Sequence, residues 1–413
     1  MINKVERKYY KKEPRFPDYP YTEWTARIGR ARQLMGKNGV DCLVLWEREN
    51  IRYFFGFQTI HWWLKSIQSA VGIIPLEGEP IIIVAALLQG NAEGLTWAND
   101  IRVVPDPHQP KVTRELPSDV AGVIKEIGYG NKRIALEMGP LGCMYIPRPL
   151  NDIEALKAAL PDAKFVDGDK VIWGCRMIKS PLEVDRIRKS IQITTVVEAA
   201  IVMGYRPGMT EVDVWKLINR TTAEQEGTRL GDDITGWAHF ICSADKAAFC
   251  DIQALEGAPI TKDSIISYDA TCYYKGYGPD NARIWQVGSI TPEIRRAYDT
   301  IFAAEDAAGD MLKAGVRANE VYEAMYGVVR GAGYGCLDMG GHGTGMDSHE
   351  PPSIDAWNEQ IIEEGMILSI EPWLTAEDGG IFGIQDTYVV TKTGCIKIDG
   401  LDRNIIQVYH PME

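Results

Sequence analysis

The second half of the chain contains one succession twice, with two helical segments followed by two strand-like segments. Apolar residues at helical spacing predict helices, and short alternating apolar runs predict strands. The predicted segments are a long helix opening at Arg176–Lys189, a helix at Val212–Gln225 with Thr210 as its N-cap, strands at Ile265–Tyr274 and Ala282–Val287, helices at Pro292–Ala314 and Asn319–Gly331, and strands at Met366–Trp373 and Ile384–Thr391. This order predicts duplicated helix–hairpin units built on antiparallel sheet.

The first half alternates strands and helices, which is typical of an α/β domain. The predicted elements are helices at Trp24–Asn38 and Pro149–Leu160 and strand-like runs at Cys42–Trp46, Ile51–Phe57, Ala70–Ile74, Pro80–Ala85 and Arg133–Glu137. We therefore expect an α+β protein. Its α/β N-terminal domain would span residues 1–178 and its antiparallel C-terminal domain residues 179–413.

Composition narrows the possible functions. The 413 residues carry a formal net charge of −13, which argues against binding to nucleic acid because phosphates require basic patches. The strongest apolar run of the N-terminal half, Ile81–Leu88, is too short to span a membrane, and Met1–Lys12 does not resemble a secretory signal. The eight cysteines are scattered without a C-x-x-C pair. Free thiols in a reducing compartment are expected, and we predict a cytoplasmic protein.

Two carboxylates fall in strand-like segments of the second half. Asp269 lies among Ile265, Ile266 and Tyr268, where a buried carboxylate is costly unless it is paired or binds a cation. Asp280 follows after a Gly/Pro turn that brings the chain back. Two like charges at short range repel each other, and a bound cation is the simplest way to keep both of them ionised.

A histidine, a third carboxylate and a glutamine follow in similar contexts. His342 lies in a glycine-rich segment, Glu371 ends an apolar run, and Gln385 is centred in another strand-like run. Glycines on both sides let a histidine approach a crowded centre. Oxygen ligands with one imidazole suit Mn, Fe(II), Co or Zn. The alternative interpretation is a set of separate, solvated or paired carboxylates with an ordinary loop histidine.

The order of these motifs resembles the pita-bread fold family, in its creatinase, prolidase and aminopeptidase P branch. The motifs are Asp-x10-Asp, Asp-x-x-Arg, Gly-His-Gly-x-Gly, a second histidine followed by Glu-Pro, Ser-Ile-Glu-Pro, and Gly-Ile-Gln-Asp-Thr. The resemblance covers both halves of the chain and includes the linker Arg176–Ser180. It implies a C-terminal pita-bread catalytic domain and a homodimer.

The resemblance also implies roles for particular residues. The expected metal ligands are Asp269, Asp280, His342, Glu371 and Gln385. His349 matches the histidine that contacts the substrate or intermediate in that branch, and Glu371 or a metal-bound water would begin the attack.

The expected substrate contacts come from two further places. They are Arg283 of the Asp-x-x-Arg motif and the loop with His61, Trp62 and Trp63, which in creatinase-like members reaches the partner subunit's site. Such a loop would suit a small, cationic substrate. The alternative for the two tryptophans is an ordinary place in the core.

The chain departs from the family pattern at two positions. Gln385 stands where the peptidases have a bridging glutamate, and a neutral amide bridges two cations poorly. We therefore expect one divalent metal or none, with the second site weakened, and no organic cofactor. The loop Ala247–Asp251 also lacks the histidine that the family places before its first aspartate.

Three functions follow from this pattern. The first is hydrolysis of a C–N bond in a small molecule or an Xaa-Pro peptide. The second is β-elimination like that of dimethylsulfoniopropionate lyase, with Asp347 as base. The third is an inactive binding protein. For either enzyme we expect a small-molecule substrate and no nucleic acid or membrane partner.

Overall fold

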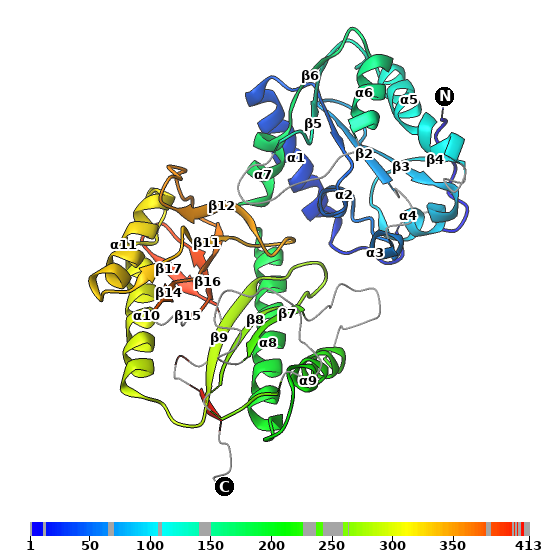
Figure 1. Cartoon of the computed structure of the whole chain (residues 1–413). Helices are drawn as coiled ribbons and strands as arrows, with labels where there is room; N and C mark the ends of the chain where they lie inside the picture. The colour runs from blue at the N-terminus through cyan, green and yellow to red at the C-terminus, as the bar shows by residue number, and fades with distance from the viewer. Residues whose placement is uncertain are drawn as a thin grey trace. The chain divides into compact units, whose positions relative to one another are not determined.

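The computed structural model describes residues 2–10, 14–64, 70–105, 110–139, 150–225, 237–242, 259–262, 264–376, 381–398, 400, 403 and 406–408. The chain divides into two compact units, Met1–Arg176 and Met177–Glu413. Figure 1 colours the first unit from blue to green and the second from green to red. In the part of the chain that the structure describes, every helix is too short or too polar to cross a membrane.

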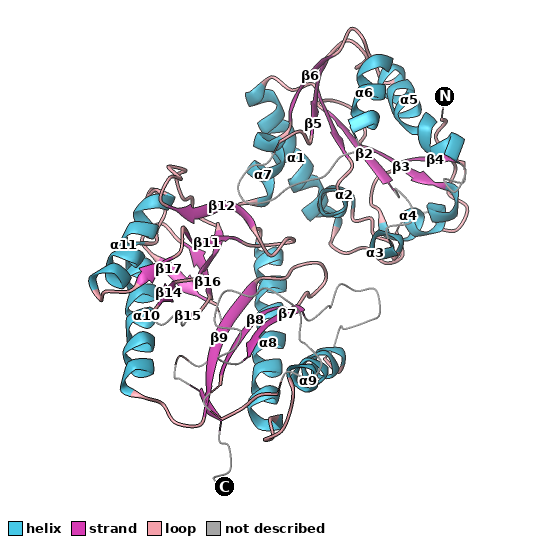
Figure 2. Ribbon diagram, in the orientation of Figure 1, coloured by secondary structure: helices cyan, strands magenta, loops and turns pink. Residues whose placement is uncertain are grey.

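The first unit is built on a mixed sheet of six strands in the order β4-β3-β2-β1-β5-β6. Its strands are β1 (Cys42–Leu45), β2 (Ala70–Pro75), β3 (Ile81–Ala85), β4 (Asp100–Val104), β5 (Arg133–Leu136) and β6 (Lys164–Asp167). Its helices are α1 (Tyr21–Asn38), α2 (Arg48–Phe55), α3 (His61–Leu64), α4 (Gln89–Leu95), α5 (Pro110–Glu126), α6 (Leu150–Ala159) and α7 (Asp169–Arg176), with a short 3-10 helix at Ala86–Leu88. Figure 2 shows α1 and α7 on one side of this sheet and α5 and α6 on the other.

One predicted strand of the first unit is a helix. The apolar run Ile51–Phe57 falls mostly in α2, because the Glu47 side chain accepts hydrogen bonds from the backbone N–H groups of Glu49 and Asn50 and caps that helix. Gly56 then ends α2 in a left-handed conformation, with φ of 70°. The apolar run is fully buried, so its pattern alone does not distinguish a helix from a strand.

The second unit contains four helices and three sheets among the residues described. Its helices are α8 (Pro181–Gly204), α9 (Glu211–Ala223), α10 (Pro292–Met311) and α11 (Ala318–Gly331). Its strands are β7 (Trp237–Cys242), β8 (Ile265–Thr271), β9 (Asp280–Val287), β10 (Gly335–Cys336), β11 (Met339–Gly343), β12 (Glu350–Asp355), β13 (Ile367–Ile370), β14 (Trp373–Thr375), β15 (Ile381–Gly383), β16 (Asp386–Val390), β17 (Cys395–Lys397) and β18 (Ile406–Val408).

The sheets of the second unit are almost wholly antiparallel. They have the orders β12-β11-β13-β16-β17, β18-β9-β8-β7 and β10-β14-β15, and among the strands that the structure describes only the β18–β9 pair is parallel. The predicted fold class is confirmed: an α/β unit precedes a unit of antiparallel sheets that carries two helix pairs. In each half of the second unit the helix pair precedes its strands, as the repeated sequence pattern predicts.

The helices α8 and α9 begin at capping boxes that are visible in the sequence. Ser180 accepts a hydrogen bond from the Glu183 backbone, and the Glu183 side chain accepts one from the Ser180 backbone. Thr210 and Asp213 form the same reciprocal arrangement at the start of α9, which confirms the predicted N-cap.

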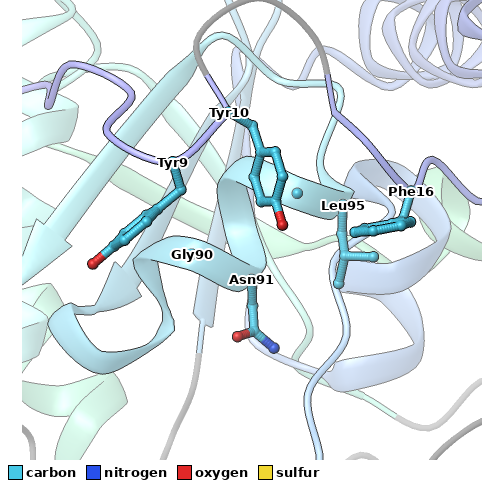
Figure 3. A pocket seen from close by; sticks show the side chains of 7 residues that line it. Tyr9, Tyr10, Phe16, Gly90, Asn91 and Leu95 are labelled. Atoms are coloured by element: carbon cyan, nitrogen blue, oxygen red, sulfur yellow. The ribbon is translucent and has the colours of Figure 1, made fainter.

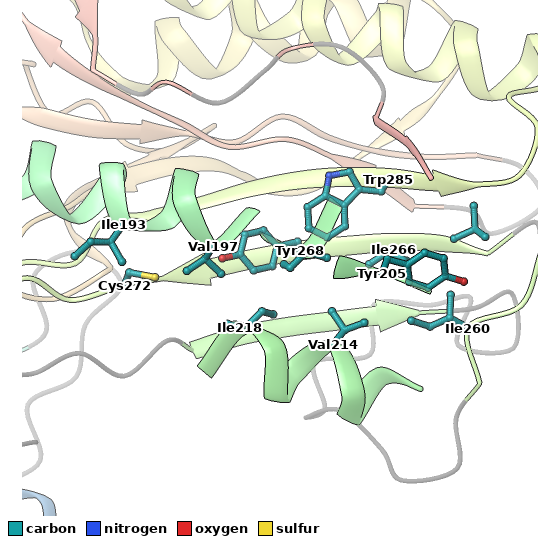
Figure 4. Packing of buried hydrophobic residues seen from close by; sticks show 12 residues of the cluster. Ile193, Val197, Tyr205, Val214, Ile218, Ile260, Ile266, Tyr268, Cys272 and Trp285 are labelled. Carbon is teal, nitrogen blue, oxygen red and sulfur yellow. The ribbon is translucent and has the colours of Figure 1, made fainter. Parts of the chain in front are cut away.

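One face of the β8–β9 hairpin packs on α8 and α9 (Figure 4). Tyr268 of β8 and Trp285 of β9 stack in this layer, with ring centroids 5.3 Å apart. The buried cluster comprises Ile193, Val197, Ile201, Tyr205, Val214, Ile218, Ile260, Ile266, Tyr268, Cys272, Trp285 and Val287. Because side chains alternate along a strand, Asp269 and Ala282 belong to the opposite face of the hairpin. The apolar layer thus supports one face of the sheet, and the other face carries Asp269.

We predict that Ile218→Ala lowers the free energy of unfolding by about 2–5 kcal/mol, because it leaves a cavity beneath β8. Ile218 is fully buried on α9, whereas Met203 is 77% exposed on α8. The control Met203→Ala should stay within about 0.5 kcal/mol of the wild type. Urea unfolding of both variants provides the measurement, and equal losses would contradict the proposed packing.

Candidate active site

One row of paired residues crosses both larger sheets of the second unit. The Glu371 N–H donates to the Gly340 carbonyl at 3.0 Å, and the Gln385 N–H donates to the Ala282 carbonyl at 3.1 Å. Ala282 pairs in turn with Asp269. The β13–β16 register, extended one residue past Ile370–Asp386, sets Glu371 opposite Gln385. Because directly paired residues share a face, Asp269, Gln385 and Glu371 lie on the same face of the joined sheet.

His342 lies two residues after Gly340 on β11 and therefore shares this face. Its imidazole is fully buried. The Nδ1 atom lies 2.9 Å from the Gly343 carbonyl, and because a carbonyl only accepts, Nδ1 carries the proton. The Nε2 lone pair then points to the Gln385 amide nitrogen at 3.1 Å, and Glu371 Oε1 lies 3.5 Å away from the same Nε2 atom.

The glycines beside His342 are required by close contact, as the sequence predicts. A Cβ atom on Gly341 would lie 2.4 Å from the Ser369 carbonyl oxygen, and its φ of +150° is unfavourable for other residues. A Cβ on Gly343 would lie 2.2 Å from the Pro351 carbonyl oxygen. Glycine at both positions lets β11 carry His342 between two crowded neighbours.

The spacing of these donors fits one cation. Donor atoms bound to a single ion at about 2.1 Å lie roughly 3.0–3.4 Å apart. The distance of 3.5 Å from His342 Nε2 to Glu371 Oε1 is close to that range, whereas the Gln385 atom beside His342 is the amide nitrogen, a hydrogen-bond donor. The Gln385 Oε1 atom is also buried and has no hydrogen-bond partner among the described residues, so an acceptor is left over in the site.

The ligand set is not complete in the described side chains. Within the residues described, no three His, Cys, Asp or Glu side chains come close enough to hold a metal, so Asp269 does not complete such a group with His342 and Glu371. Asp280 pairs with Thr271 at the start of β9, but its side chain lies outside the described part of the structure. The loop Ala247–Asp251, predicted to lack the family histidine, also lies outside it.

The His349 ring lies against that of His342, with the ring centroids 3.8 Å apart and the planes tilted by 34°. The loop that carries it closes around the Glu350 carboxylate, which accepts hydrogen bonds from the N–H groups of Met346 at 3.0 Å and Asp347 at 3.4 Å. Lys179 Nζ binds the same carboxylate at 2.8 Å, and both side chains are 1% exposed. The pair therefore fixes the loop that holds two of the predicted catalytic residues, His349 and Asp347.

Arg283 takes a different place from the one predicted. Its guanidinium is 2% exposed, donates to Asp386 Oδ1 at 2.6 Å and also reaches the Gln385 carbonyl at 3.2 Å. Arg283 follows Ala282 on the strand, so it lies on the opposite face from the site. This environment is that of a structural ion pair, and the expected substrate contact is not supported.

A second carboxyl group, that of Glu305, lies beside the ion pair of Arg283 and Asp386. Glu305 is fully buried and accepts a hydrogen bond from Tyr388 at 2.7 Å, while Lys397 bridges Glu305 and Asp386. Burial, followed by the charge of Asp386, raises the pKa of Glu305 to about 8. This pKa favours the protonated form of Glu305 near pH 7, so the ion pairs behind Gln385 are those of Asp386 with Arg283 and Lys397.

Trp373 contacts the site through its indole N–H, although it is not among the predicted site residues. Its Nε1–H donates to Glu371 Oε2 at 3.3 Å. The sequence signal is the spacing of two residues within Glu371–Trp373, which places both side chains on one side of an extended chain.

The predicted substrate loop belongs to the first unit. Trp62 packs edge-on against Phe57, with ring centroids 5.7 Å apart, and His61 is partly exposed. The side chain of Trp63 lies outside the described part. A cavity of about 350 Å³ in this unit is lined by Tyr9, Tyr10, Phe16, Gly90, Asn91, Gly94 and Leu95 (Figure 3). That lining contains none of the predicted site residues, and the role of the loop stays a prediction.

Both halves of the chain match described protein families. Residues 185–392 match metallopeptidase family M24, and residues 27–178 match the creatinase/prolidase N-terminal domain. The first match contains every position predicted as a metal ligand.

Similar proteins cover nearly the whole length. An Xaa-Pro dipeptidase of Lactobacillus delbrueckii subsp. lactis is 27% identical over 377 residues, which cover 89% of this chain and 95% of the relative. The fold is similar to that of an X-Pro aminopeptidase from Thermotoga maritima MSB8, with a TM-score of 0.77, 22% identity, and 92% and 99% of the two chains covered. The fold is also similar to that of dipeptidase PepE from Mycobacterium ulcerans, with a TM-score of 0.79 and 23% identity. That match covers 95% of this chain and 100% of the other.

We predict that Glu350→Gln destabilises the protein by about 3 kcal/mol, because it leaves the Lys179 ammonium buried without its counter-charge. The control is Glu364→Gln, which breaks an exposed pair with Lys392 whose N–O distance is 3.9 Å and should cost less than about 1 kcal/mol. Urea unfolding measures both. The double variant Lys179→Met/Glu350→Gln removes both charges and should recover part of the lost free energy of unfolding. A double variant less stable than Glu350→Gln would contradict the pairing.

Proposed function

Because the chain belongs to metallopeptidase family M24, we propose that it is a metal-dependent hydrolase that cleaves the C–N bond of an Xaa-Pro dipeptide. The observation that carries the proposal is the buried approach of His342 Nε2 to Glu371 Oε1 at 3.5 Å, beside the unsatisfied Oε1 acceptor of Gln385. The substrate class rests on the Xaa-Pro dipeptidase relative, which is aligned over almost the whole chain.

The proposed centre holds one divalent cation. His342, Glu371, Asp269 and Asp280 would be its ligands, with Gln385 Oε1 as a neutral oxygen. Oxygen donors with one imidazole suit Mn, Fe, Co or Zn. Gln385 adds no charge, so the site has three carboxylates. Three negative charges compensate one divalent cation more readily than they compensate two such cations. When bound, such a cation polarises the scissile carbonyl and lowers the pKa of water.

The protein's own groups then have distinct tasks. Glu371 would hold the cation through Oε1, because Oε2 already accepts the Trp373 indole N–H. His349, held beside His342 by the Glu350 loop, donates a hydrogen bond to the developing oxyanion of the substrate. Its partial exposure leaves the imidazole accessible from the solvent side.

Two alternatives remain distinguishable by experiment. A β-eliminating lyase would depend on Asp347, whose backbone N–H is held by Glu350. An inactive binding protein would need none of these side chains. No described contact favours either function over hydrolysis, and the tests below separate the three.

We predict one equivalent of metal in the wild type and two in Gln385→Glu, because the added charge supports a second cation. Inductively coupled plasma mass spectrometry after dialysis against Mn²⁺ provides the count. Gln360→Glu, where the glutamine contacts Met177 instead, is the matched control and should keep one equivalent. Equal metal content in the wild type and Gln385→Glu would contradict the proposed geometry.

We predict that the Mn²⁺-loaded protein hydrolyses Xaa-Pro dipeptides and that His349→Ala lowers kcat by about 10²–10⁴-fold, because a group that acts in the transition state is lost. Release of free proline measures turnover, and Asp347→Ala should retain most of it. Turnover of dimethylsulfoniopropionate that disappears in Asp347→Ala would support the lyase instead. A metal-loaded protein that turns over neither substrate would support the binding protein.

A further inference from the structure

We infer that Trp373 is a positioning residue for Glu371, and that it restricts this carboxylate to a single oxygen at the cation site. The inference rests on the proposed function. The Trp373 Nε1–H donates to Glu371 Oε2 at 3.3 Å, and Glu371 Oε1 is the atom that faces His342 Nε2 at 3.5 Å. One oxygen is thus engaged by a neutral donor while the other faces the imidazole.

The indole is fixed on its far side by a glycine. Trp373 of β14 pairs directly with Gly383 of β15, and a Cβ atom on Gly383 would lie 2.1 Å from Trp373 Cε3. Any larger residue at position 383 would therefore displace the ring. The indole lies flat against the neighbouring strand only because that strand has no side chain there.

The backbone of Trp373 is fixed as well. Its N–H donates to the Tyr326 hydroxyl at 3.4 Å, and that hydroxyl donates to the Met339 carbonyl at 2.9 Å. Trp373 is 5% exposed and Glu371 is 6% exposed. A buried hydrogen bond between two immobilised groups has little freedom to break, so the orientation of the Glu371 carboxylate is set before any ligand binds.

The fixed orientation of Glu371 affects how this residue would coordinate a cation. A free carboxylate can bind a cation through one or both oxygens. The indole N–H orients Oε2 toward Trp373, so Glu371 presents Oε1 to His342 Nε2 and to the cation site. Together with the neutral Gln385, this arrangement limits the number of charged oxygens around the cation. Trp373 therefore acts in the same direction as Gln385, toward a centre that holds a single ion.

Cobalt binding tests the inference with a readout besides activity. Co²⁺ is titrated into the wild type and into Trp373→Phe, which keeps an aromatic ring but removes the N–H. We expect Kd to rise about tenfold, the usual effect of losing a group that orients a ligand. The visible absorption of the bound Co²⁺ should also change, because Oε2 becomes available. Unchanged Kd and unchanged absorption in Trp373→Phe would overturn the inference.

Two further variants separate positioning from general damage to the fold. Gly383→Ala keeps the tryptophan but displaces its ring, and should reproduce the cobalt spectrum of Trp373→Phe. Trp285→Phe is the matched control, because Trp285 is fully buried on β9 and its Nε1 has no hydrogen-bond partner among the described residues. It should keep the wild-type Kd and spectrum. A shift in Trp285→Phe as large as that in Trp373→Phe would overturn the inference.

The hydrogen bond can also be observed without metal and without changing Trp373. In protein labelled with ¹⁵N at the indole nitrogen, Glu371→Gln should move the Trp373 Nε1–H resonance and leave that of Trp285 in place. An unmoved Trp373 resonance would overturn the inference, even where Trp373→Phe does not fold. A wild type that binds no Co²⁺ would instead count against the proposed function, while the indole resonance still decides the role of Trp373.

Discussion

The pair of backbone hydrogen bonds between Ala282 and Gln385 joins the two larger sheets of the second unit, and the site exists only where they join. Gln385 donates to Ala282 at 3.1 Å and accepts from it at 3.2 Å. The Gln385 carbonyl also accepts from Asn281 Nδ2 and Arg283 Nη1, at 3.3 and 3.2 Å. This junction brings Asp269 of one sheet level with Glu371 of the other.

Charge is distributed unequally across this junction. On the site face, Gln385 contributes a neutral amide and Trp373 engages one oxygen of Glu371. On the opposite face, Asp386 is paired with Arg283 and Lys397, and Glu305 lies beside Lys397 and Arg403. Burial and the charge of Asp386 raise the pKa of Glu305 to about 8, which favours its neutral form near pH 7. The strand before and within β16 therefore carries ionic support on one face and ligand chemistry on the other.

The elements that the sequence predicts well are those with local signals. The start of α9 follows from Thr210 and Asp213, and the strands β8 and β9 follow from their apolar runs and the turn between them. The strand predicted at Ile51–Phe57 is wrong because the residues of this run are all buried, and their pattern has no periodicity that separates a helix from a strand. The deciding contact there, the Glu47 cap, lies before the run. Site residues with a motif are predictable in the same way, whereas Lys179 acts through a partner far along the chain that no spacing reveals.

The sequence by itself determined the two-part α+β architecture and places a neutral amide, Gln385, among the candidate ligands that its motifs predict. These properties depend on residue type, on short-range periodicity and on motif order, all of which can be read along the chain. Only the tertiary structure decided that Arg283 faces away from the site, that Glu350 is neutralised by Lys179 across 171 positions of sequence, and that Trp373 engages Glu371. The physical reason is that strand register and the pairing of distant strands choose which side chains meet, and hydrogen bonds between strands far apart in sequence leave no local pattern.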